Sequence, residues 1–431
     1  MASGPLAGLH VVLVPTWFPT PERPTGGRIF QEYVEAFTGA GARVGVLYPD
    51  LVDLRNQTIH AREAGYDERL KSMRLPRTLW PTLHEEMFFG APVVRVRGLH
   101  TSLGKKERRI DRYAAWLRRA YAHYVARHGR PDILNAHCAT PAGWAALRLA
   151  QNLNPRPRVV LTEHTGPFSL LWKPAGAMEP VLHERTLSAC READALAAVS
   201  DILVKEMREA GVDREIPVIP NAVSTLFRYA PPPSIERAAS GKLRFRALYA
   251  GRFSKEKGIP ELAHAIERVA QAPDVEVHWD FFGFADEGER EEEERLARVF
   301  SSGPAKGMGT LHGMQPREVV APATRQAHFI VLPSHRDNCP LAVIEARSVG
   351  RPTVGTRDSG VEGYVEDGKD GLLCRVGDAD DLTRAILELL RPYDRWNARE
   401  IASRAEARFS ESAIAQQYAG LFSPRASATK I

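Results

Sequence analysis

Short apolar runs alternate with helical stretches along the first half of the chain. These runs are rich in β-branched residues and nearly free of charge, and they cover residues 9–15, 43–49, 131–137, 158–164, 195–200 and 217–223. Between the first two runs, residues 30–42 have the spacing of an amphipathic helix. Continuously apolar strands separated by helices are typical of a parallel sheet that helices cover on both faces. The pattern therefore predicts an α/β fold.

A break at residues 225–243 divides the chain. This stretch is poor in apolar residues and contains three consecutive prolines, which lack the amide hydrogens that a sheet interior requires. The alternation then restarts, with strands predicted at 244–251, 275–283, 327–334 and 351–356. We expect a Rossmann-like domain over 1–224, a linker over 225–243, a second Rossmann-like domain over 244–405 and a C-terminal helical segment over 406–431.

This tandem arrangement also predicts where ligands bind. A chain of 431 residues is long enough for two hydrophobic cores. Ligands of open parallel sheets bind beyond the carboxyl ends of the strands. We therefore expect the two sheets to face a central cleft that holds the ligands.

Composition and charge narrow the class of protein. The chain carries 58 Lys and Arg against 53 Asp and Glu, a net charge of +5, which favours anionic ligands but is too balanced to indicate nucleic acid. Cysteines stand far apart at Cys138, Cys190, Cys339 and Cys374, so we expect neither a disulfide framework nor a zinc site. The apolar run at 9–15 is shorter than a signal core or a membrane span, which predicts a cytoplasmic protein.

Residues 104–130 form a strongly basic segment with aromatic residues at helical spacing. Two interpretations stay open. The segment is either a surface helix whose aromatic stripe packs into the core, or an interfacial helix that is attracted to anionic lipid. The second would place the protein at the periphery of the inner membrane face. Within the preceding segment, 50–104, the stretch MRLPRTLWPTLHEEMFFGAP (73–92) is irregular and aromatic.

Two strand-to-helix junctions in the second half carry candidate chemistry. In YAGRFSKEKGIPELAHAI, residues 249–266, Arg252 and Lys257 flank one glycine-containing loop and could bracket a diphosphate. Alone, such a loop is also a common charged turn.

The second junction, PSHRDNCPLAVIEA over 333–346, predicts a helix that begins near Pro340. The amides of Asn338, Cys339 and Leu341 would then form another anion site at its N-terminus. Asp337 in the loop and Glu345 in the helix would by themselves suit a cap and a salt bridge. Beside an anion loop, the two carboxylates are better explained by the hydroxyl groups of a sugar and a ribose.

The ordered set of motifs resembles the family 4 retaining glycosyltransferases, which have the two-domain GT-B fold. The resemblance runs nearly end to end through VPTWFPTPERPTGGRIFQEYVEAFTGAGARV (14–44), DILNAHCATPAGWAAL (132–147), VVLTEHTGPF (159–168), AAVSD (197–201), IPNAV (219–223), AGRFSKEKG (250–258), the pair Asp337 and Glu345, and DSGVEGYVEDGKDGLL (358–373). It also implies a C-terminal helix that crosses back to the first domain. Asp337 stands where the family has a glutamate, and Glu362 is displaced by one position from the family's acidic residue.

The resemblance implies a role for each matching residue. Donor-binding positions would be Gly27, Arg252, Lys257, Asp337, Asn338, Cys339, Pro340, Leu341 and Glu345. Among these, Arg252 and Lys257 would hold the diphosphate, Glu345 the ribose and Asp337 a sugar hydroxyl. His164 would lie near the reacting sugar. The acceptor-side candidates are His137, Thr16 and Arg28.

The implied reaction is transfer of a hexose-type sugar from a nucleotide diphosphate sugar with retention at the anomeric carbon. Cationic side chains and helix termini would stabilise the departing diphosphate, so we expect neither a metal nor another cofactor. The one D-x-D match, Asp378 to Asp380, reads as a helix cap.

Other classes remain as alternatives. A dinucleotide-dependent oxidoreductase is disfavoured because the glycines of GAGARVG, 39–45, follow a helix and precede a strand. A sugar-nucleotide 2-epimerase and a noncatalytic sugar-nucleotide-binding subunit share the expected architecture. The acceptor could be a saccharide, a lipid-linked saccharide or a natural product.

Overall fold

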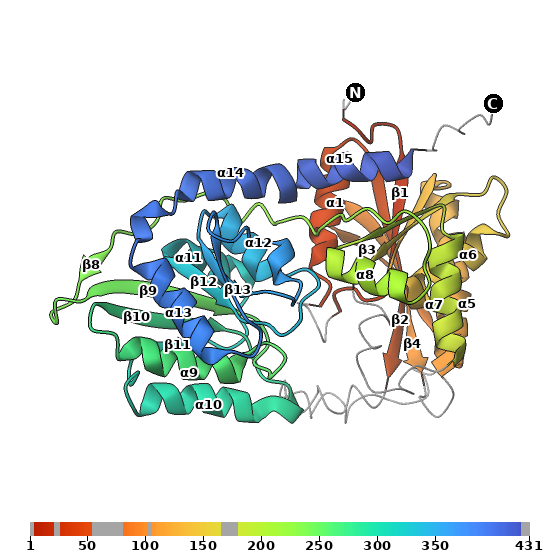
Figure 1. The fold of residues 1–431 in the computed structure, drawn as a ribbon. Helices are drawn as coiled ribbons and strands as arrows, with labels where there is room; N and C mark the ends of the chain where they lie inside the picture. Colours follow the sequence, from red (N-terminus) through yellow and green to blue (C-terminus); the bar gives the residue numbers. More distant parts are fainter. Residues whose placement is uncertain (1–3, 21–25, 54–80, 101–105, 165–179, 424–431) are drawn as a thin grey trace. The chain divides into compact units, whose positions relative to one another are not determined.

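The computed structural model describes residues 4–20, 26–53, 81–100, 106–164 and 180–423 (Figure 1). The chain divides into two compact units. Unit 1 comprises Met1–Ala222 and Ile414–Ile431, and unit 2 comprises Val223–Ala413. Each unit has its own parallel sheet with flanking helices, as the apolar pattern predicts.

In the described part of unit 1, a seven-stranded sheet has the order β3-β4-β2-β1-β5-β6-β7. Its strands are β1 (His10–Pro15), β2 (Arg43–Asp53), β3 (Thr82–Phe88), β4 (Ala91–His100), β5 (Ile133–His137), β6 (Arg158–Glu163) and β7 (Ala195–Ala198). Neighbouring strands are parallel except for the β3–β4 hairpin. Strands β1, β5 and β6 are almost wholly buried, which explains their continuous apolar character.

Helices cover this sheet. They are α1 (Ile29–Gly39), α5 (Lys106–His128), α6 (Trp144–Ala150), α7 (Pro180–Glu192), α8 (Asp201–Glu209) and α15 (Glu411–Phe422). The aromatic stripe of α5 is buried, namely Tyr113, Trp116, Leu117, Tyr121 and Tyr124. This stripe is therefore part of the core, and only the basic face of α5 is exposed. Within the described residues, no helix is both long and apolar enough to cross a bilayer.

The C-terminal helix α15 packs against elements of unit 1 that are distant from it in the sequence. The rings of Tyr418 and Phe422 contact Phe37 of α1, with ring centroids 5.1 and 5.3 Å apart. The hydroxyl of Tyr418 lies 2.8 Å from that of Thr162 in β6. All of these side chains are buried, so they anchor the end of the chain to the first core.

Unit 2 contains a second seven-stranded sheet in its described residues, ordered β11-β10-β9-β12-β13-β14 with β8 paired to β9. The strands are β8 (Glu236–Arg237), β9 (Leu243–Ala250), β10 (Val275–Phe282), β11 (Gly309–Leu311), β12 (Phe329–Leu332), β13 (Thr353–Thr356) and β14 (Gly371–Cys374). Its helices are α9 (Ile259–Ala270), α10 (Arg290–Ser301), α11 (Arg317–Gln326), α12 (Leu341–Ser348), α13 (Ala379–Leu390) and α14 (Ala398–Phe409). Helix α9 contacts α10 and α13, while α12 contacts α11 and α14 (Figure 1).

Three segments differ from the sequence-based expectation. Residues 217–223 form a single bridge, Ala198 to Val218, because Pro217 and Pro220 lack the amide donors of a longer ladder. The segment expected to be irregular contains the β3–β4 hairpin. Residues 225–243, expected as a linker, are counted with unit 2. The prolines of this segment cannot donate hydrogen bonds, but their carbonyl oxygens can accept them. Arg351 of unit 2 donates a hydrogen bond to the carbonyl oxygen of Pro231 at 2.9 Å.

Candidate functional site

In unit 2, two loops at the carboxyl ends of β9 and β12 are held together by backbone contacts. Gly258 begins α9 with φ of 69°, and a Cβ atom there would lie 2.1 Å from the carbonyl oxygen of Pro333. The amide of His335 donates to the carbonyl of Glu256 at 2.8 Å. The glycine therefore permits a close approach that brings two distant sequence motifs into one site.

The central contact of this site joins Lys257 and Asp337. The Nζ atom of Lys257 donates to Asp337 Oδ2 at 2.6 Å, and the two side chains are only 16% and 17% exposed. A charge-assisted bond in a mostly enclosed place holds both side chains in a fixed position. The sequence motifs predict one shared ligand for these two residues, and their side chains are in direct contact.

Arg252 has a different environment from Lys257. Its side chain is 46% exposed and lies 3.3 Å from Asp286 and 3.7 Å from Glu256. Exposed ion pairs of this kind contribute little free energy. The guanidinium can therefore exchange these carboxylates for another anion at small cost.

The loop before α12 is ordered by its own polar contacts. Pro340 caps the helix, and its carbonyl accepts from the amides of Val343 and Ile344 at 3.0 and 3.2 Å. The amide of Asp337 donates to the carbonyl of Ser359 at 2.7 Å. Asn338 accepts a hydrogen bond from Arg336 at 2.8 Å. Cys339 and Leu341 are partly exposed, and the predicted anion loop lies next to Lys257 and Asp337.

Glu345 is 9% exposed on α12, and its charge has a partner within the protein. The Nε atom of Arg317, the first residue of α11, lies 3.6 Å from Glu345 Oε1. The sequence leaves a salt bridge open as one role for Glu345, and the structure contains that salt bridge. A cation at the first position of a helix opposes the helix dipole, and that unfavourable placement is the signal that could have revealed Arg317.

The later loop of unit 2 contains Glu362, the acidic residue displaced from the family pattern. Its Oε2 atom accepts from the amides of Ser359 at 3.1 Å and Gly360 at 2.8 Å. Glu362 is exposed, and the φ of Gly360 is 95°. This carboxylate therefore stabilises a turn, and the carbonyl of Ser359 in turn holds Asp337.

In unit 1, His137 and His164 form a buried pair at the ends of the neighbouring strands β5 and β6. Nδ1 of His137 lies 2.9 Å from Nε2 of His164, and both side chains are almost completely buried. Burial lowers the pKa of His164 to about 3, and burial together with His164 lowers the pKa of His137 well below its ordinary value. Both rings are therefore neutral at neutral pH.

The remaining candidates of unit 1 lie around this pair. Thr16 donates to the carbonyl of His137 at 2.8 Å. Gly27, with φ of 74°, packs against the backbone of Phe18, and Arg28 caps α1 with a partly exposed side chain. Of these positions, only Thr16 contacts the histidine pair directly, through the carbonyl of His137.

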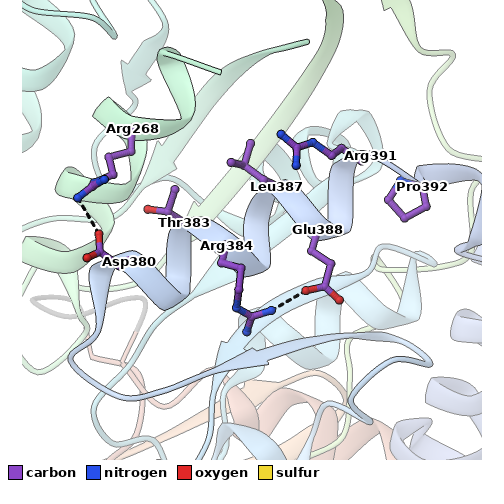
Figure 2. Close-up of a pocket in the computed structure, with 8 residues that line it drawn as sticks. All are labelled: Arg268, Asp380, Thr383, Arg384, Leu387, Glu388, Arg391 and Pro392. Atoms are coloured by element: carbon purple, nitrogen blue, oxygen red, sulfur yellow. Dashed lines mark hydrogen bonds and ion pairs between the residues drawn. The ribbon is translucent and has the colours of Figure 1, made fainter. Parts of the chain in front are cut away.

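A surface pocket of about 590 Å³ lies elsewhere on unit 2, between α9 and α13 (Figure 2). It is rich in arginine, but each guanidinium has an acidic partner. Arg268 pairs with Asp380 at 2.9 Å, and Arg384 pairs with Glu388 at 2.5 Å. The pocket therefore offers little net positive charge for an anion. Nearby, Asp378 accepts from the amide of Asp381, which confirms its role as a helix cap.

Two family models match the chain. The model described as Glycosyltransferase Family 4 covers residues 26–226, and the model described as Glycosyl transferases group 1 covers residues 244–392. The chain is 26% identical over 311 residues to the lipopolysaccharide core biosynthesis glycosyltransferase LpsE of Rhizobium meliloti, which covers 70% of this chain and 78% of that protein. It is 25% identical over 346 residues to the putative colanic acid biosynthesis glycosyltransferase WcaL of Escherichia coli, with 76% and 80% covered.

Solved structures share the fold over nearly the whole length. Sucrose-phosphate synthase from Thermosynechococcus elongatus matches with a TM-score of 0.69 and 19% identity, covering 96% of this chain and 98% of that one. Anabaena HepE in complex with UDP and glucose matches with a TM-score of 0.65 and 16% identity, covering 96% and 99%.

Proposed function

This chain belongs to the glycosyltransferases of family 4 and group 1 and has their GT-B fold, and from this premise we propose a specific reaction. The enzyme transfers a hexose-type sugar from a nucleotide diphosphate sugar to an acceptor hydroxyl, with retention at the anomeric carbon. Unit 2 holds the donor and unit 1 holds the acceptor. The observation that carries the proposal is the contact between Lys257 and Asp337.

In this proposal the Lys257–Asp337 pair is a preformed donor site. The ammonium group faces the donor diphosphate, while Asp337 keeps it oriented and accepts a hydrogen bond from a sugar hydroxyl. Holding both groups in place before the donor arrives reduces the reorganisation needed when charge develops on the leaving group. Arg252 turns from its exposed carboxylates to the diphosphate as a second cation.

Glu345 accepts hydrogen bonds from the ribose hydroxyls in the same proposal. Arg317, whose Nε atom lies 3.6 Å from Glu345 Oε1, orients the carboxylate. Two solved structures with this fold contain a nucleoside diphosphate, namely UDP in Anabaena HepE and ADP in Arabidopsis starch synthase IV. We therefore expect a nucleoside diphosphate as product.

The chemical step needs no protein nucleophile. The bond between the anomeric carbon and the donor phosphate oxygen breaks, and a bond from the acceptor oxygen to the same carbon forms on the same face. The acceptor proton passes to the departing diphosphate. Lys257, Arg252 and the amides at the start of α12 stabilise the negative charge, so the reaction proceeds without a metal.

The acceptor is a hydroxyl of a saccharide, a lipid-linked saccharide or a natural product. The names of LpsE and WcaL, for lipopolysaccharide core and colanic acid biosynthesis, favour a saccharide of the cell surface. We therefore place the protein in the cytoplasm, with access to the inner face of the membrane.

A thermal-shift screen against UDP, GDP, ADP and TDP sugars tests the donor assignment. We expect one nucleotide to raise the midpoint of wild-type unfolding and to have little effect on Lys257→Ala. Equal stabilisation of that variant by every nucleotide would contradict the assignment. Release of a 2-epimerised sugar without acceptor would indicate the epimerase alternative, and binding without turnover of any donor would indicate a noncatalytic subunit.

A further inference from the structure

In unit 2, the loop after β9 is joined to the loop after β10 by backbone contacts. The amide of Gly251 donates to the carbonyl of Phe282 at 2.9 Å. Two residues further along both segments, the amide of Phe253 donates to the carbonyl of Phe284 at 2.8 Å. Gly283 approaches so closely that a Cβ atom there would overlap the carbonyl oxygen of Gly251. The two loops therefore keep a fixed position relative to each other.

A strongly acidic run begins in the loop after β10. Residues 286–294, DEGEREEEE, contain seven acidic residues and one arginine. Such a run is usually a solvated surface. Two of its carboxylates instead approach cations of the loop after β9. Asp286 Oδ2 lies 3.3 Å from Arg252 Nη1, and Glu291 Oε2 lies 3.9 Å from Lys255 Nζ. The run therefore places negative charge beside the loop to which the proposed function assigns the donor diphosphate.

The side chain of Asp286 contributes little to the local backbone structure. Asp286 precedes a short 3-10 turn, Glu287–Glu289, and its carboxylate makes no capping hydrogen bond there. The turn is closed by the backbone, because the amide of Glu289 donates to the carbonyl of Asp286 at 2.8 Å. In the described part of the chain, the only ion pair of Asp286 is the one with Arg252. The carboxylate of Asp286 therefore acts mainly on Arg252.

We propose that Asp286 is a positioning residue that competes with the donor diphosphate for Arg252 and thereby sets the affinity of the site for nucleotide. This inference rests on the proposed function. A guanidinium pairs with carboxylates and phosphates through the same hydrogen-bond geometry, so the diphosphate must displace Asp286 before it can use Arg252. The free energy of that exchange is subtracted from the free energy of binding. Glu256, at 3.7 Å from Arg252, competes more weakly because it lies farther away.

This competition gives the two cations of the site different roles. Lys257 and Asp337 form a mostly enclosed pair, in which the side chains are 16% and 17% exposed. The side chains of Arg252 and Asp286 are each 46% exposed, so their pair is easily exchanged for another. The carboxylate of Asp286 therefore weakens the hold on the diphosphate without disturbing the enclosed pair. A weaker hold favours departure of the nucleoside diphosphate product, and product release limits the turnover of many enzymes.

Isothermal titration calorimetry of the full chain tests this competition without an acceptor. UDP, GDP, ADP and TDP are each titrated into the wild type, and the nucleotide that binds most tightly is the probe for the variants. We expect Asp286→Asn to bind this nucleotide about threefold more tightly, the order of change expected when an exposed ion pair no longer has to be broken. The matched control is Glu294→Gln, since Glu294 belongs to the same acidic run but pairs with Arg298 of its own helix. Its affinity for the nucleotide should equal that of the wild type.

A second background separates competition for Arg252 from general repulsion of the nucleotide. Arg252→Gln removes the group for which the two anions compete, so adding Asp286→Asn to it should leave the affinity unchanged. Unchanged or weaker binding by Asp286→Asn alone would overturn the proposal. An equal gain in the Arg252→Gln background, or in Glu294→Gln, would overturn it too, in favour of general repulsion. If none of the four nucleotides binds the wild type, the proposed function itself is contradicted, and this inference with it.

Discussion

Lys257 of the loop after β9 donates a 2.6 Å hydrogen bond to Asp337 of the loop after β12, and the two residues are 80 positions apart in the chain. The parallel order β9-β12 places these loops side by side at one edge of the sheet. Gly258 then allows α9 to approach the end of β12 closely. The fold therefore positions the two side chains on which the proposed reaction depends.

Removing the cation of this pair should greatly slow catalysis. We expect Lys257→Ala to lower kcat/KM by at least about 100-fold, the order observed when one charge-stabilising donor is lost from an active site. The matched control is Lys255→Ala, because Lys255 lies in the same loop and its side chain is 67% exposed. Steady-state donor hydrolysis measures both variants. Equal decreases of kcat/KM in the two variants would show that the rate depends on the total positive charge of the loop and not on the contact between Lys257 and Asp337.

Arg317 should act on the donor through Glu345. Arg317→Gln leaves the mostly buried carboxylate without this cation, which we expect to raise the donor KM by about tenfold, an order of magnitude typical for a charge-assisted contact. The effect on kcat should be small, and Arg317→Lys should restore most of the affinity. If Arg317→Gln lowers kcat and leaves KM unchanged, the positioning role is wrong.

The histidine pair predicts a pH dependence of stability. Burial on folding lowers the pKa of His164 from its ordinary value of 6.5 to about 3, so the unfolded chain binds more protons below pH 6.5. The stabilising effect of neutral His164 is complete above pH 6.5 and is lost as pH falls toward 3, by about 1.4 kcal/mol per pH unit. Chemical denaturation at pH 7 and pH 5 measures this loss. His137→Asn combined with His164→Asn should show a smaller loss, and an unchanged loss would refute the assignment.

The close approach at Gly258 predicts a steric effect on stability. Gly258→Ala should destabilise unit 2 by about 2–4 kcal/mol, because strain at positive φ is added to a clash with the Pro333 carbonyl. Gly368→Ala is the control, since Gly368 has a φ of 80° with open space around its Cβ position. That variant should lose only about 1 kcal/mol, the cost of φ strain alone. Similar losses in denaturant unfolding would contradict the steric explanation.

Much of the fold follows from local sequence. The buried strands β1, β5 and β6 are continuously apolar, which is the signal of a parallel sheet covered on both faces. Strand β3 gave no such signal, because none of its seven residues is buried and its pattern does not alternate. Its position depends on pairing with β4 and on Glu85, which no local pattern contains.

The candidate site could be predicted only in part, because local motifs do not contain contacts between residues that are distant in the sequence. Motifs within single loops identified Arg252, Lys257 and Asp337, and each loop follows a strand as expected. The Arg317–Glu345 pair depends on contact between two helices, and the His137–His164 pair depends on strand register. Such relationships arise only after the chain is folded.

The stereochemistry of donor hydrolysis tests the central claim most directly, because it requires no knowledge of the acceptor. Proton NMR would follow the first hexose released from an α-linked nucleotide diphosphate sugar in the presence of EDTA. We predict that the α anomer appears first, and that its release is retained in Lys255→Ala and lost in Lys257→Ala. Initial release of the β anomer, or hydrolysis that EDTA abolishes, would contradict a retaining, metal-independent transferase.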